Sequence, residues 1–459
     1  MSAVLLIVIP LLAAFLSILS KKLAPYIMII VSFTLIILLA FIPEETVVIG
    51  GFTAPYGISL VADTFSIFTL YVINVLFFLV AVINVAKYKK LSTILLVAMA
   101  GLNGLLLTGD LFNLFVFLEI TGISAYLITV TNNKPLHTFH YLVAGTVGSS
   151  LYLLGIVILY NMFGTLNIAD LSNAMIGVDP VNVAFPFLLM FIGLGVEAKL
   201  LPFNAWVKGI LGNSNILSGP MIAGIFASAS LFIFGRLLTE LFIMSDELTL
   251  IVSVVLGFSI LAGEAMAFSS TKARQILLFS SIAQAGIAVL VFSYGFTAFG
   301  LLFVALNGFS KIVLFLVINH VSDEFGSDKV DDLKGIFLKN VAVGIGFTIV
   351  VLSILGMPLF AGFYVKIGIL TELFDSGDIV FPAIILISSV VEGVYFIKLL
   401  IALWYSNDEA REVRFDFKLS YLVVVIALLF IVFGVYWTPF DEFISLIIGV
   451  KGGIFTWLV

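Results

Sequence analysis

The segment Gly195-Val-Glu-Ala-Lys-Leu-Leu-Pro-Phe-Asn-Ala-Trp206 decides the fold of this chain, because Lys199 and Pro202 interrupt an otherwise apolar stretch. The segment Gly356-Met-Pro-Leu-Phe-Ala-Gly-Phe-Tyr-Val-Lys366 carries Pro358 in the same way, five spans later. Proline removes a backbone donor and clashes with the preceding turn, so a helix kinks or unwinds there. Two interrupted spans at matching positions are typical of the inverted repeats of transporters. Ordinary kinks in a bundle are the alternative, but the lysine in each segment favours a transport unit.

The composition is that of a membrane protein, with 62% hydrophobic residues, 10% charged residues and a mean hydropathy of +1.27. No soluble core needs so much apolar sequence. The net charge of −6 comes without a basic patch, so nucleic acid is excluded as a partner. The chain has no cysteine and only three histidines, and we therefore predict no metal and no cofactor. The lack of cysteine and the two glutamines are typical of a thermophile.

Apolar stretches predict an all-α polytopic membrane protein with about fourteen transmembrane helices. Helices four to eight and nine to thirteen form the two predicted inverted repeats, in which helices seven and twelve are broken. The predicted spans are 3–20, 25–42, 64–86, 91–108, 111–130, 138–162, 183–201, 216–241, 248–268, 274–293, 297–320, 340–372, 379–405 and 418–437.

These spans divide the chain into four predicted parts. They are an N-terminal three-helix segment at 1–90, a first repeat at 91–241, a second repeat at 248–405, and a C-terminal helix with a tail at 406–459. Within the tail, residues 441–458 are apolar but contain Lys451, and we predict a short interfacial segment there.

Basic residues occur in every second connection between the spans. Lys21, Lys87, Lys208, Lys272 and Arg411 lie in odd-numbered connections, whereas the even-numbered connections contain no lysine or arginine. This asymmetry is the positive-inside pattern of polytopic membrane proteins. We therefore predict a multi-pass protein of the cell membrane with both termini outside.

Glu119 lies near the middle of the fifth span, too far from either end for its carboxylate to reach water. An isolated charge at the bilayer centre costs about 3 kcal/mol on insertion scales, so such a group is neutral or paired. Lys199 is the expected partner, because moving the carboxylate changes how strongly the lysine holds its proton. Lys311 and Lys366 are placed on the same polar axis. For each of these residues a purely structural hydrogen bond is the alternative.

Glu392 and Lys398 share one predicted helix. Because they are six residues apart, their side chains differ by a rotation of about 240° about the helix axis. They cannot both face one partner directly, and either is a candidate path end or a group that reaches the interface. Glu197 is expected to face away from Lys199, and Glu264 lies near a helix end. We expect structural roles for these last two.

Five motifs occur in an order that runs from residue 108 to residue 366. They are Thr108-Gly-Asp-Leu-Phe-Asn-Leu-Phe-Val-Phe-Leu-Glu-Ile120, Gly164-Thr-Leu-Asn-Ile-Ala-Asp-Leu171, Lys199-Leu-Leu-Pro-Phe-Asn-Ala-Trp206, Arg274-Gln-Ile-Leu-Leu-Phe-Ser-Ser-Ile-Ala-Gln-Ala-Gly286 and the segment ending at Lys366. Together they resemble the D-type subunit of Mrp antiporters and its relatives, the antiporter-like subunits of respiratory complex I, membrane-bound hydrogenases and sulfane sulfur reductases.

The resemblance implies a fourteen-helix unit with two inverted five-helix repeats. In it Glu119 pairs with Lys199, and Lys311 and Lys366 extend a hydrated axis along the membrane plane. The transported ion would be the proton, with or without sodium. The partners would be other membrane subunits, including another antiporter-like subunit, and the lipid bilayer. No catalytic site is expected in this chain, although it would be a subunit of an oxidoreductase complex.

The chain departs from the family pattern at three positions of the relay. Asn204 stands where a histidine is frequent, Ser228 replaces the usual lysine of the eighth helix, and Asn307 replaces a histidine four residues before Lys311. Asparagine and serine bind water but do not titrate, so proton transfer from Lys199 would depend on ordered water.

Three functions fit these observations. The first is an ion-translocating antiporter-like subunit of a redox-driven complex of hydrogenase, sulfane reductase or complex I type. The second is the D-type subunit of a stand-alone Mrp cation/proton antiporter. The third is a non-pumping structural paralogue, favoured by the combined changes at Asn204, Ser228 and Asn307.

The loop charges generate a topology prediction. Single cysteines placed at Lys89 and at Glu45 in this cysteine-free chain should react with an impermeant thiol reagent from opposite sides of the membrane. Labelling of intact cells and of inverted vesicles measures this directly. Reaction of both positions from one side would overturn the assigned orientation.

Overall fold

The computed structural model describes residues 2–83, 87–89, 91–405, 413–439, 441–442 and 445. Met1, Arg411, Val459 and almost all of the predicted interfacial segment at 441–458 lie outside the described residues. The chain forms two compact units, one of Met1–Ile210 with Ile225–Val255 and one of Leu211–Gly224 with Leu256–Val459. We call them unit 1 and unit 2, and each is described by itself.

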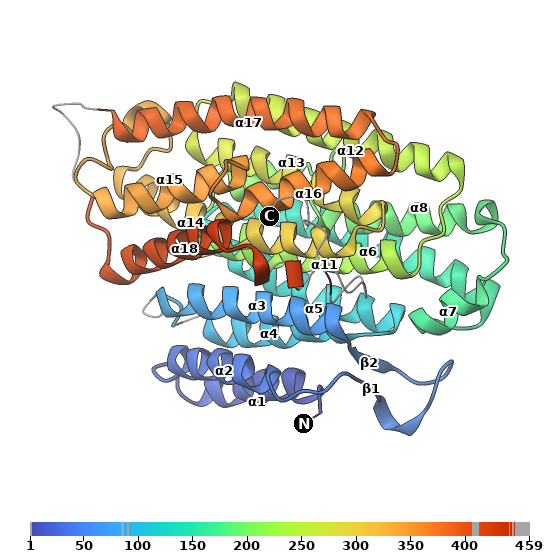
Figure 1. Ribbon diagram of the computed structural model, residues 1–459. Helices are drawn as coiled ribbons and strands as arrows, with labels where there is room; N and C mark the ends of the chain where they lie inside the picture. Colours follow the sequence, from blue (N-terminus) through green and yellow to red (C-terminus); the bar gives the residue numbers. More distant parts are fainter. Residues whose placement is uncertain are drawn as a thin grey trace. The chain divides into compact units, whose positions relative to one another are not determined.

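Unit 1 is built mainly from apolar helices (Figure 1). They are α1 (Leu5–Leu19), α2 (Ala24–Leu39), α3 (Thr64–Ile83), α4 (Ser92–Leu107), α5 (Leu111–Thr129), α6 (Pro135–Phe163), α7 (Ile168–Ala174), α8 (Pro180–Glu197) and α11 (Ala227–Glu240), with short 3₁₀ turns at Ile49–Gly51 and Val130–Asn132. Helices α1 and α2 pack on α3 and α4, and α5, α6 and α8 follow in contact order. Short α9 (Val207–Leu211) ends this part of unit 1. Along the chain, α10 (Ser218–Pro220), which belongs to unit 2, and a π-helical turn at Met221–Phe226 precede α11.

A β-hairpin closes one end of unit 1, beside α7 (Figure 1). Strands β1 (Glu45–Val48) and β2 (Ser59–Ala62) pair antiparallel, and β2 contacts α3 and α4. Asp110 caps the start of α5 by accepting from the Asn113 amide at 2.8 Å, and burial raises the pKa of this carboxyl. The two strands and α7 were not predicted from the sequence, because they are short and follow no long apolar pattern.

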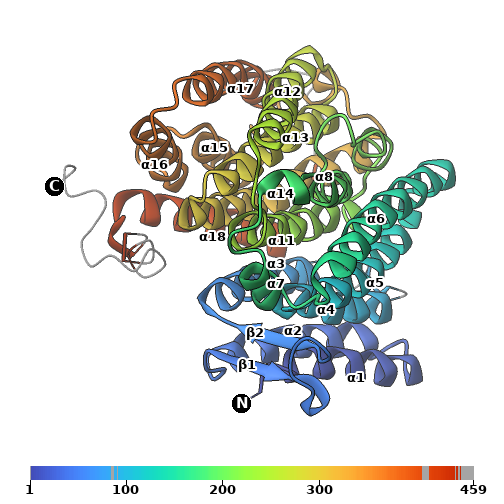
Figure 2. The ribbon, with the colours of Figure 1, turned by 90° about the vertical axis from the view of Figure 1, so that its right-hand side faces the viewer.

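Unit 2 contains the remaining long helices. They are the second half of α12 (Asp246–Ser269), α13 (Ala273–Ser293), α14 (Thr297–Phe325), α15 (Val341–Leu355), α16 (Ala361–Asp375), α17 (Val380–Trp404) and α18 (Phe417–Val435), with a 3₁₀ turn at Val330–Leu333. Helix α14 contacts α13, α15, α16 and α18, and α17 lies against α13, α15 and α16 (Figure 2). Helices α13 and α14 are almost entirely buried, which identifies them as the core of this unit.

The predicted spans coincide with the observed helices, and the helix is interrupted at both predicted positions. Residues 198–206 separate α8 from α9, and residues 356–360 separate α15 from α16, so Pro202 and Pro358 lie within the breaks. Among the described residues, ten helices are long and apolar enough to cross a membrane, and α1, α2, α4 and α15 are shorter apolar helices. The chain is therefore a polytopic helical membrane protein, with one small hairpin added.

Glycines set the distance between α6 and α8 in unit 1. A Cβ atom on Gly193 of α8 would lie 2.5 Å from the Gly148 carbonyl oxygen of α6, which is far inside van der Waals contact. Gly393 of α17 is also inside an apolar helix, but a Cβ atom there meets nothing within 4 Å.

We predict that Gly193→Ala lowers the free energy of unfolding by about 1–3 kcal/mol, because the two backbones must move apart. Gly393→Ala should be neutral or slightly stabilising, because alanine is the better helix former. Thermal unfolding of the purified protein in one detergent compares the pair. Equal melting temperatures for the two variants would contradict the close α6–α8 packing.

Candidate functional site

The first helix break places Lys199 inside unit 1. Helix α8 ends at Glu197, and Lys199 has a left-handed backbone (φ 65°) while only 2% of its surface is exposed. The freed carbonyl groups find side-chain donors, because Asn204 donates to the Lys199 oxygen at 3.3 Å and the Trp206 indole donates to the Val196 oxygen at 3.2 Å. A buried lysine in a rare backbone conformation is typical of a functional site. The side chain of Asn204 therefore holds the backbone in place where the helix is broken.

An acidic and aromatic cluster lies near this break in unit 1. Glu119 of α5 is half-buried, and it lies within electrostatic range of Glu197 and of the Tyr126 hydroxyl. Tyr126 meets Tyr141 edge to face at 4.6 Å between ring centroids, and Tyr141 stacks on Trp206 at 3.9 Å. These rings connect α5, α6 and the break. Glu197, for which a structural role is expected, lies within electrostatic range of Glu119, and its role stays a prediction.

The predicted pairing in unit 1 is not among the contacts that the structure gives for Glu119. The structure places Glu119 with Glu197 and Tyr126, and the pairing of Glu119 with Lys199 stays a prediction. Ser228, where the family pattern has a lysine, is buried at the start of α11, directly after the π-helical turn. Such turns occur often at functional sites, but they leave no simple pattern in a sequence.

The second break orients Lys366 in unit 2. Gly356 ends α15 in a left-handed conformation (φ 75°), and the Gly362 amide at the start of α16 donates to the Ser353 hydroxyl at 3.2 Å. Leu359, between the two helices, is also left-handed (φ 76°). Lys366 follows on the second turn of α16, with 8% of its surface exposed.

Lys366 forms a buried ion pair with Glu392. The Lys366 Nζ and Glu392 Oε2 atoms are 2.8 Å apart, and Glu392 is fully buried. Gln284 of α13 donates to the second oxygen, Oε1, at 2.6 Å. The carboxylate is thus satisfied by one charged and one neutral donor, as a charge away from water requires. Glu392 was predicted as a candidate path end, and the structure makes it the partner of Lys366.

Lys398 lies on the other side of α17. Its side chain is exposed, and its Nζ atom is 5.0 Å from the ring centroid of Phe268 on α12. Glu392 faces the interior of unit 2, so the two residues point apart, as their spacing predicts. The structure therefore does not bring Lys398 together with the ion pair of Lys366.

Lys311 is the second buried lysine of unit 2. Its side chain is 2% exposed, and its Nζ atom donates to the Ser280 hydroxyl at 3.0 Å. Glu392, Glu264 and Lys366 all lie within electrostatic range of Lys311. Two lysines and two glutamates thus share one buried cluster, in which their formal charges cancel.

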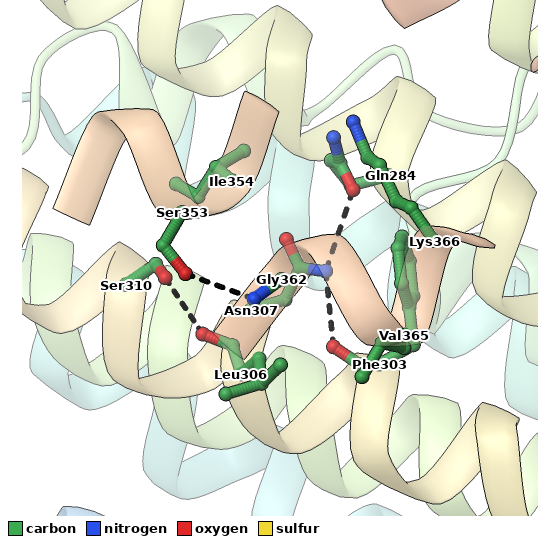
Figure 3. Close-up of a pocket in the computed structure, with 10 residues that line it drawn as sticks. All are labelled: Gln284, Phe303, Leu306, Asn307, Ser310, Ser353, Ile354, Gly362, Val365 and Lys366. Atoms are coloured by element: carbon green, nitrogen blue, oxygen red, sulfur yellow. Dashed lines mark hydrogen bonds between the residues drawn. The ribbon is translucent and has the colours of Figure 1, made fainter. Parts of the chain in front are cut away.

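Asn307 lines a cavity of about 20 Å³ between α14, α15 and α16, next to Lys366 (Figure 3). Its amide nitrogen donates to Gln284 Oε1 at 3.3 Å and to the Phe303 carbonyl at 3.0 Å. Its Oδ1 atom is buried and has no hydrogen-bond partner among the described residues. The cavity can hold one water molecule, which an unpartnered amide oxygen would bind.

Glu264 belongs to the same cluster, although its position near the end of α12 suggested a structural role. It is 2% exposed, and the Ser388 hydroxyl donates to its Oε1 atom at 3.1 Å. A signal was present in the sequence, because Leu256, Ile260, Glu264 and Ala267 recur at helical spacing. Glu264 therefore lies on the stripe of α12 that faces the core of unit 2.

Arg236, a basic residue well inside the predicted span 216–241, has a structural setting. It is 3% exposed in α11 and pairs with Asp63 at 2.8 Å and with Glu240 at 3.1 Å. Its guanidinium also donates to Ser66 of α3 at 2.6 Å. These bonds tie α11 to the start of α3 within unit 1.

Comparisons with known proteins agree on one family. The family model described as NADH:quinone oxidoreductase/Mrp antiporter, TM matches residues 108–392. The NADH-quinone oxidoreductase subunit N of Desulforudis audaxviator (strain MP104C) is 30% identical over 370 residues, or 77% of this chain and 74% of that protein. The D-type subunit of the Na(+)/H(+) antiporter of Alkalihalophilus pseudofirmus is 25% identical over 395 residues, or 82% and 80%.

A solved structure resembles nearly the whole chain. It is a chain of the membrane-bound sulfane sulfur reductase, an archaeal respiratory membrane complex, which is 27% identical, covers 96% of both chains and gives a TM-score of 0.89. The matched family region contains Glu119, Lys199, Lys311, Lys366 and Glu392.

The ion pair in unit 2 generates a stability prediction. Lys366→Met leaves Glu392 buried without its cation and should lower the free energy of unfolding by about 3–5 kcal/mol. The double variant Lys366→Met with Glu392→Gln removes both charges and should recover most of that loss. Thermal unfolding measures all three proteins. A double variant that is no more stable than Lys366→Met would show that the pair is not formed.

Proposed function

We propose that this chain, which belongs to the NADH:quinone oxidoreductase/Mrp antiporter membrane family, translocates protons as the antiporter-like subunit of a redox-driven membrane complex. The observation that carries the proposal is the buried Lys366–Glu392 ion pair beside Lys311. Intramembrane charges that are held in the protein interior typically mark ion pathways. The partner class follows the sulfane sulfur reductase complex, whose chain matches this one over nearly its full length.

Charge balance supplies the mechanism in unit 2. Protonation of Glu392, or loss of a proton from Lys311, unbalances the cluster, and the attraction between Lys366 and Glu392 changes with it. Because the surroundings are apolar, the balanced state is restored by moving a proton onward rather than by hydration. Gln284 links the ion pair to Asn307 and its water-sized cavity, so a water molecule there would carry the proton past a residue that does not titrate.

In unit 1 we assign the switch to Glu119 and Lys199. The helix break supports this assignment, because freed backbone groups around Lys199 let a buried side chain move between two partners. Glu197 and Tyr126 would share the negative charge of Glu119 when the lysine turns away. Asn204 and Ser228 do not titrate, and water would replace them in the relay.

The finer architecture is part of the same proposal. We assign fourteen membrane crossings, with inverted repeats at 91–241 and 248–405 between the 1–90 segment and the 406–459 segment. The breaks at Pro202 and Pro358 support the repeat, because each is followed or preceded by a buried lysine. The loop charges favour the cell membrane with both termini outside.

A stand-alone Mrp cation/proton antiporter is the second candidate assembly. The similarity to the D-type subunit of an Na(+)/H(+) antiporter over 82% of this chain favours it. The two candidates differ in their partners, so the peptides that co-purify with the chain decide between them. Subunits with iron–sulfur or nickel sites would establish the redox complex, and their absence from a complete, active assembly would establish the antiporter. A non-pumping paralogue is the third candidate, and it gains support if the next prediction fails.

Glu119→Gln should abolish proton translocation and leave the complex assembled, because glutamine keeps the shape and hydrogen-bonding capacity of the side chain. Lys199→Ala should do the same, and the double variant should be no worse than either single one, as for residues that act as a unit. Proton uptake by vesicles and co-purification of partners measure these effects.

Glu324→Gln, an exposed glutamate at the end of α14, is the matched control and should keep full translocation. Unchanged translocation in an assembled Glu119→Gln complex would remove the proposed switch and favour the non-pumping paralogue.

A further inference from the structure

Besides Asn307 Oδ1, two polar atoms in the cluster around Lys311 are buried without a hydrogen-bond partner within the described part of the chain. They are Glu264 Oε2 and the Tyr395 hydroxyl oxygen, and both side chains are 2% exposed. A buried polar atom without a partner is destabilising, so each such atom calls for an explanation such as a bound water molecule or a functional role. The pathway through Lys366 and Glu392 uses neither atom.

The backbone of α12 brings Glu264 close to α13. A Cβ atom on Gly263 would lie 2.9 Å from the Ala283 amide nitrogen, so the two helices touch at that level. Ser280 lies on α13 one turn before Gln284, and Ser388, Glu392 and Tyr395 lie on one face of α17. Glu264 therefore faces the hydroxyl groups of Ser388 and Tyr395 on α17.

The hydroxyls of Ser280 and Tyr395 form a path from Lys311 to Glu264. The Lys311 ammonium group donates to Ser280 Oγ at 3.0 Å. The Tyr395 hydroxyl lies close enough to Ser280 and to Glu264 to interact with both, although its oxygen completes no hydrogen bond among the described residues. Ser388 holds Glu264 Oε1 at 3.1 Å, which leaves Oε2 as the open oxygen. A small rotation of the tyrosine hydroxyl completes the path.

We propose that Glu264 is a proton-binding residue that exchanges a proton with Lys311 through the hydroxyls of Ser280 and Tyr395. The proposal rests on the proposed function, since it extends the proton path inside unit 2. In the transfer, the Lys311 ammonium gives a proton to Ser280 Oγ, the Ser280 proton passes to the Tyr395 oxygen, and the Tyr395 proton passes to Glu264 Oε2. Lysine and glutamate both end neutral, and both hydroxyls are restored.

The charges around Glu264 favour this exchange. Glu392 lies within electrostatic range, so two ionised carboxylates repel each other and a proton on Glu264 relieves that repulsion. Lys366 also lies within electrostatic range of Glu264, and its Nζ atom is 2.8 Å from Glu392 Oε2. If that ion pair broke, the negative charge of Glu392 would no longer be balanced by Lys366. Glu264 would then hold its own proton with a different strength. The ion pair thus controls the new site.

A proton fits this site better than a metal cation does. A dehydrated cation needs several oxygen ligands, but both oxygens of Glu392 already accept bonds from Gln284 and Lys366. Ser280 and Ser388 are engaged with Lys311 and Glu264 Oε1. Glu264 Oε2 and the Tyr395 hydroxyl remain, and these two atoms suit one shared proton.

The test uses vesicles that contain the assembled complex and a trapped pH-sensitive dye. Glu264→Gln and Tyr395→Phe should each lower the proton translocation rate at least tenfold while the subunits still co-purify. Glu372→Gln on α16 and Tyr421→Phe on α18 are matched controls, because their side chains lie outside the cluster, and both should keep the wild-type rate. Tyr395→Phe keeps the ring and removes only the hydroxyl group. Of the two variants, it is therefore expected to disturb assembly of the complex less.

An infrared difference spectrum between high and low pH separates proton binding from a structural role. A carbonyl band of a protonated carboxylic acid should disappear in Glu264→Gln and persist in Glu372→Gln. Wild-type translocation in both Glu264→Gln and Tyr395→Phe, while Glu119→Gln abolishes it, would overturn the Glu264 site and leave the proposed function intact. Wild-type translocation in all three would overturn the proposed function itself.

Discussion

The cost of placing a charge away from water is the constraint on which the structure depends. Lys311, Lys366, Glu264 and Glu392 are each at most 8% exposed inside unit 2, in a chain with 62% hydrophobic residues. Such charges persist only when each is paired or hydrogen-bonded. The ion pair of Lys366 with Glu392 and the bond from Lys311 to Ser280 meet that condition. Glu264 Oε2 has no partner among the described residues, and the cluster therefore responds to a single added or removed proton.

The helix breaks make such a cluster possible. An unbroken helix uses every backbone group within itself, whereas the turns at Lys199 and at Gly356 free carbonyl and amide groups for side chains. Asn204, Trp206 and Ser353 satisfy some of these groups, so the broken backbone stays ordered without water. The breaks thus place the backbones of Lys199 and Lys366 inside their units, which brings each lysine within reach of other buried polar groups.

Local patterns in the sequence predicted the spans and both breaks, because hydropathy and proline act within a few residues. The pairing of charged side chains from different helices could not be predicted in this way. Glu392 and Lys366 were both singled out, but their contact depends on how α16 and α17 are rotated about their axes. Glu264 was set aside for its place near a helix end, although its helical spacing marked it as buried. The hairpin β1–β2 and the π-helical turn are too short to produce a recognisable hydrophobic pattern in the sequence.

The most direct test of this mechanism is the number of protons moved per turnover of the partner's reaction, measured in vesicles with the intact complex and with Lys311→Met. Methionine fills the volume of the lysine but carries no proton, and Lys311 is the residue that faces Glu392, Glu264 and Lys366 together. Turnover should continue in the variant while the proton number falls. An unchanged proton number in the assembled variant would contradict the mechanism.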